Sequence, residues 1–413
     1  MGMSVCEKIL YAHAIGLKGK ALKVGEVVCL EPDWLLCSEA CWAHMDKWYT
    51  TYGRPGFRRK DRFWLAPDHL VDPRINDLPR QREAIQACEK IAEELELNDN
   101  YNPPNTTIVH TEFYRSRCQP GMLIFGADSH TGSSGCLGSL AIGMGPSDVF
   151  IQLLTGETYL RVPPIVRINI VGEPKFGITG KDIILGVLGL IKRNTACYER
   201  LVEFTGPGLK YLSCDARFTM SNMVTELGGI GACVVADEIT KAYIEARKDK
   251  RHKNDAIYYA PDPDAHYESS FNIDLAQIHT FVALFPSPDN VKPIDEVERF
   301  KLDGVFIGAC TTTEEELILA ALVLEQGLLA GMKPVDHGTR KVTPGSTNIV
   351  NRLRNLGLLD IYERAGFIIG APGCSYCVGL SADQAGKGEV WLSSQNRNFR
   401  DRMGPGNSPW NEI

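Results

Sequence analysis

Short apolar runs alternate with longer amphipathic stretches along the whole chain. The short runs are rich in β-branched and aromatic residues, which predicts buried strands at 107–109, 122–125, 165–171, 304–307 and 367–369. The longer stretches repeat apolar residues every three or four positions, which predicts helices at 82–94, 181–191, 314–326 and 347–355. Alternation of this kind favours α/β layers with a mainly parallel sheet.

Glycine and proline gather where three of these predicted strands end, at 125–132, 306–311 and 369–374. In open α/β sheets, ligands collect outside the carboxyl ends of the strands. Two of the runs place a cysteine just past a strand, Cys310 in one and Cys374 in the other. The sequence therefore predicts a ligand site at these strand ends.

Size and charge narrow the class of protein. The 413 residues are 44% hydrophobic, which is enough for a large core divided into two or three subdomains. The net charge is −7, and the densest basic stretch, 247–253, contains an acidic residue, so we expect it on a solvated loop or helix end rather than on nucleic acid. No apolar run is long enough to span a membrane, and the longest, 183–191, is interrupted by glycine and predicts a core helix.

The cysteines do not follow the pattern of a disulfide framework. There are 13, an odd number with irregular spacing, and no apolar leader precedes them. A reducing compartment fits better, so we expect the cytoplasm, or the mitochondrial matrix if the source is a eukaryote. Most of them are expected to be small buried hydrophobes: Cys6, Cys88, Cys136, Cys197, Cys214 and Cys233. A weaker hypothesis is that Cys29, Cys37 and Cys41 form a second metal group.

Cys310 and the pair in Gly373-Cys374-Ser-Tyr-Cys377 carry a different signal. A lone Cys-x-x-Cys is also compatible with redox activity or zinc, although zinc needs a fourth ligand and none is obvious nearby. Three thiolates, by contrast, can hold an iron–sulfur cube by three of its four irons. The fourth iron then lacks a protein ligand and can act on a substrate as a Lewis acid.

Three polar runs add candidate chemistry. Asp128, Ser129, His130 and Thr131 follow a predicted strand within a glycine-rich loop, and such groups are costly to bury unless they are paired or bound to something. Alone, this run is equally compatible with an ordinary polar turn. In Asp68-His69 a carboxylate can fix the tautomer of the imidazole and raise its pKa. The stretch 396–402 offers arginines suited to carboxylates, or a solvated charged turn.

Taken in order, these runs resemble the aconitase superfamily over nearly the whole chain. Eight motifs carry the resemblance: Asp68-His69, Ile108-Val-His110, Asp128-Ser129-His130-Thr131, Gly206-Pro-Gly, Ser221-Asn222-Met223 with Glu226, Gly308-Ala-Cys310-Thr311, Gly373-Cys374-x-x-Cys377, and Asn396-Arg397-Asn398-Phe399 with Arg402. The length and the run 287–293 are most similar to the large subunits of 3-isopropylmalate dehydratase and to microbial homoaconitase. The fold implied is aconitase-like, with three-layer α/β/α subdomains around a central cluster-containing cleft.

The resemblance also implies roles for individual residues. Cys310, Cys374 and Cys377 match the ligands of one [4Fe–4S] cluster per chain, and His69, supported by Asp68, matches the proton donor to the departing hydroxide. The remaining matches line the site or bind the substrate and its carboxylates: His110, Asp128, Ser129, His130, Asn222, Glu226, Asn396, Arg397 and Arg402.

Two departures and one missing segment qualify the resemblance. The family usually continues the first cysteine with Thr-Asn, where this chain has Thr311-Thr312-Thr313, and 192–197 replaces a glycine-rich loop. In the family the base is a serine in a Ser-Ser-Arg segment of a separate swivelling domain, and no such segment occurs in these residues. We therefore expect 1–413 to form one catalytic module without a swivel domain. A small subunit is then expected to supply the base.

The resemblance favours a hydro-lyase acting on a small di- or tricarboxylic hydroxy acid. 3-Isopropylmalate is the first expectation for the substrate, and the alternatives are a homoaconitase or a specialised alkylmalate dehydratase. A different class is a non-catalytic cluster-sensing or RNA-binding protein, or a scaffold without a cluster. The acidic charge argues against RNA, and the three cysteines with their histidines argue against a scaffold.

Overall fold

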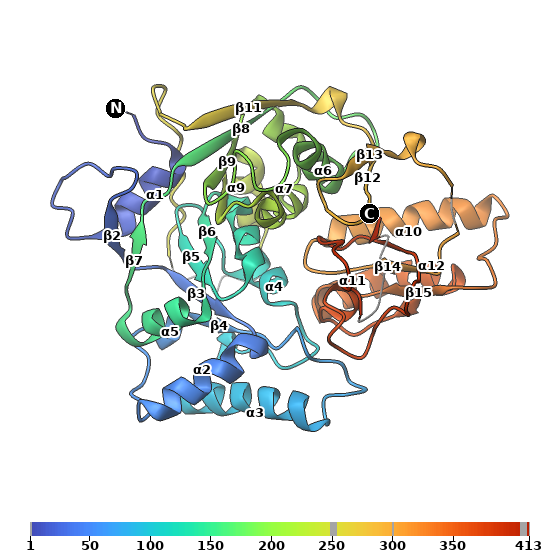
Figure 1. Ribbon diagram of the computed structural model, residues 1–413, viewed down its shortest axis with the longest axis horizontal. Coiled ribbons are helices and arrows are strands. Elements are labelled where there is room, and N and C mark those ends of the chain that lie inside the picture. Colours follow the sequence, from blue (N-terminus) through green and yellow to red (C-terminus); the bar gives the residue numbers. More distant parts are fainter. Residues whose placement is uncertain (1, 248–253, 300, 405–410, 413) are drawn as a thin grey trace.

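A computed structural model describes residues 2–247, 254–299, 301–404 and 411–412. Two sheets dominate the molecule, one of eight strands and one of five (Figure 1). The larger sheet has the strand order β11 (Ser269–Asp274), β8 (Ile165–Val171), β9 (Leu201–Thr205), β10 (Gly231–Val234), β6 (Leu140–Gly143), β5 (Leu123–Gly126), β3 (Trp34–Cys37) and β4 (Phe63–Leu65).

The larger sheet consists of two parallel halves. All its neighbouring strands are parallel except β10 and β6, which are antiparallel, with Gly231 opposite Ile142. The amino end of β10 therefore lies at the same edge of the sheet as the carboxyl ends of β6, β5, β3 and β4. The segment that precedes β10 therefore lies beside the segments that follow β5 and β4.

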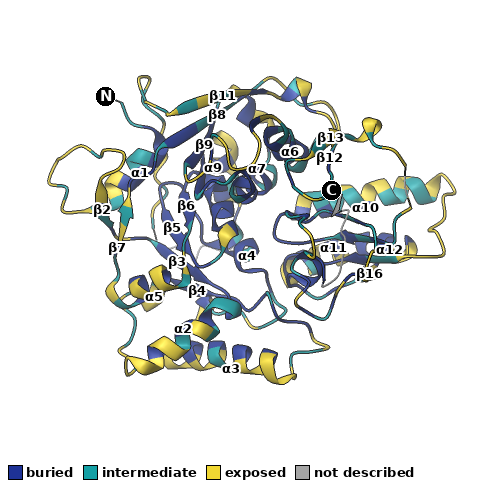
Figure 2. Cartoon of the chain, viewed as in Figure 1, coloured by how far each residue is buried: buried dark blue, intermediate teal, exposed yellow. Residues whose placement is uncertain are grey.

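Helices cover both faces of the larger sheet (Figure 2). In β3, Leu35 and Cys37 pack in one core and Trp34 and Leu36 in another, as the period of two along a strand requires. The first core also contains α1 (Val5–His13), α2 (Glu39–Thr51), α3 (Pro79–Glu94) and α5 (Pro146–Thr155). The opposite face is covered by α4 (Val109–Ser116), α6 (Gly180–Ile191), α7 (Cys214–Asn222), α8 (Val224–Leu227) and α9 (Glu238–Ala246).

The five-stranded sheet is entirely parallel and lies in the part of the chain coloured orange to red in Figure 1. Its strand order is β16 (Ile368–Ile369), β15 (Thr339–Val342), β14 (Gly304–Ile307), β17 (Trp391–Ser393) and β18 (Asn411–Glu412). One face packs against α10 (Glu314–Leu329), α11 (Thr347–Asn355) and α12 (Leu358–Arg364). On the other face, Phe306 packs against Tyr376 and Trp391 of the segments that carry the site.

Two small antiparallel sheets complete the fold. They are β1 (Ala14–Ile15), β2 (Val27–Leu30) and β7 (Thr158–Arg161) in one, and β12 (Phe281–Ala283) with β13 (Val291–Pro293) in the other. Among the described residues, no helix is both long and apolar enough to cross a membrane. All 13 cysteines are free thiols.

The predicted α/β layers with mainly parallel sheets are confirmed, and so are four of the five strands and all four helices, within a few residues at their ends. The strand predicted at 107–109 is wrong. Its β-branched residues favour a strand, but Thr107 forms only an isolated bridge with Ser346, and α4 begins at Val109. The backbone N–H of Val109 donates to Asp68 (2.8 Å), so a distant carboxylate stabilises a helix start there.

The basic stretch at 247–253 is described only at its first residue. Residues 248–253 lie outside the described part of the chain. Arg247 lies at a helix end as expected, since it is the C-cap of α9, but it is buried rather than solvated, and its guanidinium donates to the carbonyl of Cys118 (2.6 Å). Because α9 packs against α4 and against the loop that follows α4, Arg247 is shielded from solvent.

Candidate active site

The candidate residues come from strand ends of both large sheets. Asp128 follows β5 and Asp68-His69 follows β4, while Glu226 precedes β10 at the same sheet edge. In the other sheet, Cys310, Cys374 and Asn396 follow β14, β16 and β17. The site thus forms where the carboxyl ends of two groups of parallel strands face each other, which is the position expected for ligands in α/β folds.

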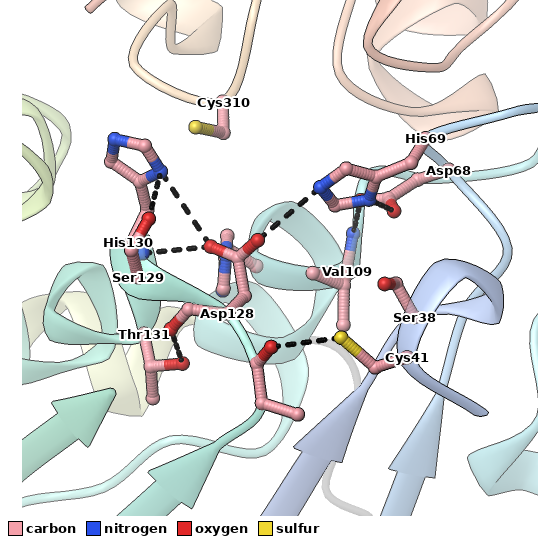
Figure 3. Close-up of polar contacts among 12 residues, drawn as sticks. Ser38, Cys41, Asp68, His69, Val109, Asp128, Ser129, His130, Thr131 and Cys310 are labelled. Atoms are coloured by element: carbon pink, nitrogen blue, oxygen red, sulfur yellow. Dashed lines mark hydrogen bonds and ion pairs between the residues drawn. The ribbon is translucent and has the colours of Figure 1, made fainter. Parts of the chain in front are cut away.

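Asp128 lies between the imidazoles of His69 and His130 (Figure 3), and the imidazole of His110 is a third neighbour. Its carboxylate is 3.3 Å from Nε2 of His69, 3.0 Å from Nε2 of His110 and 3.5 Å from Nδ1 of His130. It also accepts the backbone N–H of His130 (2.7 Å) at the start of the 3₁₀ helix η3 (Ser129–Leu137). Burial opposes the charge of Asp128, but the hydrogen bonds from the three histidines hold its pKa well below its ordinary value. The carboxylate therefore stays ionised in the site.

His69 is held between two carboxylates. Nδ1 donates to Asp68 (2.5 Å) while Nε2 faces Asp128. Burial would lower the pKa of His69, but the charges of Cys374 and Asp68 and the hydrogen bonds to Asp128 and Asp68 raise it well above its ordinary value. A ring with both nitrogens donating is an imidazolium, so His69 can carry a transferable proton.

Glu226 connects the histidines to the arginine of the last motif. One of its oxygens, Oε1, is 3.1 Å from Nε2 of His130 and accepts from Nε of Arg397 (2.8 Å). Arg397 also donates to Oγ of Ser129 (2.9 Å). Burial would raise the pKa of Glu226, but the charges of His130 and Arg397 lower it below its ordinary value.

The three cysteines are buried together with amide and guanidinium donors. Asn222 and Asn396 both donate to Sγ of Cys310, at 3.2 and 3.3 Å, and Arg402 lies 3.6 Å from Sγ of Cys377. Burial, followed by the charge of Cys377, raises the pKa of Cys310. Hydrogen-bond donors directed at sulfur stabilise the thiolate form that binds a metal. A bound cationic metal group would in turn offset the cost of burying the thiolate charges.

The spacing of these thiols helps to distinguish the kinds of metal group. Zinc–sulfur bonds of about 2.3 Å bring the sulfurs around a single ion to within about 4 Å of one another. Cys310, Cys374 and Cys377 are not all within 4.8 Å of one another. The three residues therefore fit a group with several metal atoms, such as an iron–sulfur cube, better than one zinc ion.

A closer set consists of Asp68, His69 and Cys374, whose ligand atoms do lie within 4.8 Å. Asp68 is already occupied, since one oxygen binds His69 and the other accepts from Val109. We therefore interpret this set as a hydrogen-bonded Asp–His pair beside a cysteine rather than as a separate metal site.

Three buried polar atoms of the candidate residues have no hydrogen-bond partner within the described structure. They are Nδ1 of His110, Oε2 of Glu226 and Nε of Arg402. Buried polar groups are nearly always paired, so these three atoms are available to a bound ligand.

The structure gives a local reason for the departure after Cys310. Thr313 is the N-cap of α10 and forms a capping box with Glu316. Thr312 hydrogen-bonds to Ser394 (2.7 Å) and to the carbonyl of Gly308. The two threonines therefore stabilise the helix start and tie the Cys310 loop to the segment after β17.

The hypothesis of a second metal group at Cys29, Cys37 and Cys41 is wrong for a single ion. Their sulfurs are not within 4.8 Å of one another. The thiol of Cys37 donates to the carbonyl of Ser38, and that of Cys41 donates to the carbonyl of Ala127. Cys41 nevertheless lies beside the site, and burial raises its pKa to about 11 (Figure 3).

Sequence reasoning missed Glu39, which is fully buried at the start of α2. Its carboxylate accepts the backbone N–H groups of Asp68 (2.8 Å), His69 (2.9 Å) and Leu70 (2.5 Å). It thereby fixes the loop that carries the Asp–His pair. The available signal was the single acidic residue of the mainly apolar stretch 34–45, two positions after a strand.

Comparison with known proteins shows the family to which the chain belongs. Residues 9–409 match the model of the aconitase family (aconitate hydratase). Aconitase htyD of Aspergillus rugulosus is 50% identical over 406 residues, which are 98% of this chain and 46% of that protein. The 3-isopropylmalate dehydratase large subunit gloJ of Glarea lozoyensis is 48% identical over 408 residues, 98% of this chain and 44% of that protein. The chain thus spans about half the length of these relatives.

A bacterial relative has nearly the same length as this chain. The 2,3-dimethylmalate dehydratase large subunit of Eubacterium barkeri is 33% identical over 409 residues, 98% of this chain and 93% of that protein. Among solved structures, holo aconitase X of Thermococcus kodakaraensis superposes with a TM-score of 0.51 over 90% of this chain and 84% of that one. At 12% identity, this likeness concerns the fold alone.

Proposed function

Because the chain belongs to the aconitase family, we propose that it is the cluster-binding part of an iron–sulfur hydro-lyase that acts on a small di- or tricarboxylic hydroxy acid. One observation carries the proposal. An ionised Asp128 surrounded by three imidazoles lies in the same site as three buried thiols, and the sulfurs of Cys310 and Cys377 receive hydrogen-bond donors.

Cys310, Cys374 and Cys377 would hold one [4Fe–4S] cluster per chain. When bound, such a cluster supplies a Lewis-acid position for the hydroxyl group of the substrate. Asn222 and Asn396 donate to the sulfur of Cys310, so in this proposal they stabilise its thiolate.

His69 is the proposed general acid. Asp68 retains the proton on Nδ1, so the proton on Nε2 is the one available for a departing hydroxide. Asp128 keeps His69, His110 and His130 in fixed positions around the reacting group. The raised pKa of His69 keeps it protonated near neutral pH.

The arginines are the proposed carboxylate-binding groups. Arg397 is oriented by Glu226 and Ser129, and Nε of Arg402 lies buried without a partner beside Cys377. Forked guanidinium donors match the geometry of a carboxylate. A substrate with two or three carboxylates fits a site with these two cations.

A second polypeptide is proposed to supply the base. The 413 residues contain no Ser-Ser-Arg segment, and the bacterial relative that the chain matches along nearly its whole length is named a large subunit. In this proposal, residues 1–413 form one catalytic module without a swivel domain. The fungal relatives of twice the length have room for that further part in the same chain.

The substrate is proposed to be 3-isopropylmalate, in line with the name of the relative from Glarea lozoyensis. A homoaconitase or a specialised alkylmalate dehydratase is the alternative, and the relative from Eubacterium barkeri is named for such a substrate. A panel of malate and citrate homologues distinguishes these substrates.

Anaerobic reconstitution tests the function. The chain is loaded with iron and sulfide, candidate small subunits are added, and hydration of each unsaturated acid is followed by its loss of absorbance. We expect about four irons per chain and turnover only with a partner. No iron uptake would favour a scaffold, and fast turnover by the chain alone would contradict the separate base. A loaded chain inactive with every partner and substrate would favour a cluster-sensing role.

A further inference from the structure

The turn between Cys374 and Cys377 has an unusual backbone. Ser375 has a φ of +48°, in the left-handed region that residues with a Cβ seldom adopt. It opens the short 3₁₀ helix η7 (Ser375–Cys377), which has Cys374 as its N-cap and Cys377 as its last residue. A residue held in this region needs surrounding contacts that stabilise it.

Asp383 supplies such a contact. Oγ of Ser375 donates to Oδ2 of Asp383 (2.7 Å), and Nζ of Lys341 forms an ion pair with the same oxygen. Asp383 is 5% and Lys341 6% exposed, so both charges are withdrawn from water. The other oxygen of Asp383 accepts from Arg74 (2.6 Å). Asp383 is therefore held in place by two cations in addition to its hydrogen bond with Ser375.

The same carboxylate joins the segments that carry the site. Lys341 lies on β15, which pairs with β14, the strand that leads to Cys310. Arg74 lies in the loop that carries His69, and the carbonyl of Asp68 accepts from the backbone N–H of Cys374 (2.7 Å). The backbone at Gly370 leaves the room that Lys341 needs, since a Cβ there would lie 2.6 Å from Cε of Lys341.

We propose that Asp383 and Lys341 are positioning residues that, through Ser375, set the placement of the Cys374 and Cys377 thiols for cluster binding. This inference rests on the proposed function, because it presupposes that these thiols bind a cluster. Buried ion pairs are often no more stabilising than apolar side chains of the same volume. The buried charges of Asp383 and Lys341 are therefore better explained by a role in orienting Ser375 than by a contribution to the stability of the fold.

Cluster retention tests the proposal in the whole chain. Asp383→Asn and Lys341→Met are reconstituted anaerobically beside the wild type, and iron and sulfide per chain, the visible absorption and the rate of iron loss to a chelator are measured. We expect both variants to lose iron about 10-fold faster, as is usual when groups that orient metal ligands are changed. Asp237→Asn is the matched control, since it removes a carboxylate at the start of α9, on the larger sheet, that pairs with the buried Arg217.

Ser375 provides a milder pair of variants in case the ion-pair variants do not fold. Ser375→Ala loses the hydrogen bond to Asp383 and keeps the unfavourable backbone, whereas Ser375→Gly loses the hydrogen bond but relieves the backbone. We expect iron loss to be slowest in the wild type, faster in Ser375→Gly and fastest in Ser375→Ala.

The outcomes separate the two proposals. The positioning role is overturned if the wild type loads iron and the variants retain it as long as Asp237→Asn does, namely Asp383→Asn, Lys341→Met and both Ser375 variants. That outcome leaves the proposed function intact. A wild type that binds no iron overturns the proposed function and the positioning role with it.

Discussion

At the scale of single residues, the site depends on carboxylates whose environments differ. Asp128 is half-buried among three imidazoles and has a lowered pKa, whereas Glu39 is fully buried among backbone N–H groups beside Asp68. Burial, followed by the charge of Asp68, raises the pKa of Glu39. The first carboxylate contacts the proposed reacting groups. The second acts only through the loop that it holds.

Glu39→Gln tests this positioning role. A carboxamide can accept from some of the three N–H groups, but its own NH₂ must face at least one of them. We expect the free energy of unfolding to fall by about 1–3 kcal/mol, the cost of one unsatisfied buried group. We also expect kcat to fall more than KM changes, because the Asp–His pair is displaced. Steady-state kinetics and urea unfolding of the reconstituted enzyme measure both.

Iron content is measured beside the kinetics, because the carbonyl of Asp68 accepts from the backbone N–H of Cys374 and rates are compared per loaded cluster. A variant with unchanged kcat and lower stability would show that Glu39 is structural alone.

At the scale of elements, helix ends and loops show where the chain departs from local preference. The C-cap residue of α6, Lys192, has φ 67° and ψ 152°, a conformation used almost only by glycine. This position opens the stretch 192–197. The backbone there has a glycine-like conformation although the residue is lysine.

Lys192→Gly is expected to stabilise the protein by about 1 kcal/mol, because it removes the steric conflict of the Cβ. Urea unfolding at constant pH measures the change. Lys241→Gly, in the middle of α9, is the matched control and should destabilise by about 1 kcal/mol. Equal destabilisation by both substitutions would contradict the expectation.

The connection between α1 and β3 is expected to depend on pH. His13, the last residue of α1, forms an ion pair with Asp33 at 2.7 Å. Burial opposes both charges, but the hydrogen bond between the two side chains raises the pKa of His13 above 6.5 and lowers that of Asp33 below 3.8. The stabilisation from His13 is therefore full below pH 6.5 and lost as pH rises through its folded pKa. The stabilisation from Asp33 is present above pH 3.8 and is lost as pH falls through the folded pKa of Asp33.

His13→Gln should consequently cost most between about pH 4 and 6.5, by about 1–3 kcal/mol, and progressively less at higher pH. Urea unfolding of the variant and the wild type at pH 5, 7 and 9 measures the difference. A cost that stays constant across these values would show that the imidazolium does not contribute.

At the scale of the whole molecule, the three thiols belong to the part of the chain built on the five-stranded sheet, while the imidazoles belong to the part built on the larger sheet. Contacts join the two parts. Nζ of Lys181 in α6 donates to the carbonyls of Ser394 and Gln395, and Thr219 in α7 donates to the carbonyl of Thr311. The site is complete only when both parts are in place.

Removal of the cluster is expected to loosen one part more than the other. Amide exchange should become about 10-fold faster in 304–377, which contains all three cysteines, and change less in the strands of the larger sheet. Hydrogen exchange with mass spectrometry on the reconstituted and chelator-treated chain measures this. Equal acceleration in both parts would show that the chain responds as a single unit.

Much of the fold was predictable because its signals are local. Apolar periodicity predicted 165–171 as a strand and 347–355 as a helix, and both are confirmed, since neighbouring residues alone decide which side of an element is apolar. The run 107–109 was predicted wrongly because the carboxylate of Asp68, distant in sequence, stabilises a helix start at Val109. Glu39 was missed for the same reason, since its partners lie in a loop 29 to 31 residues away.

The sequence by itself determined the elements, the order of the motifs and the residue types at the site, including three cysteines and an Asp–His pair. Only the tertiary structure decided how they meet. The contact between Glu226 and Arg397 spans 171 residues, and Ser129 lies 268 positions from the same guanidinium. No local pattern records such contacts, because they arise from the packing of whole sheets. That packing brings the strand ends of both sheets together around one buried, charged site.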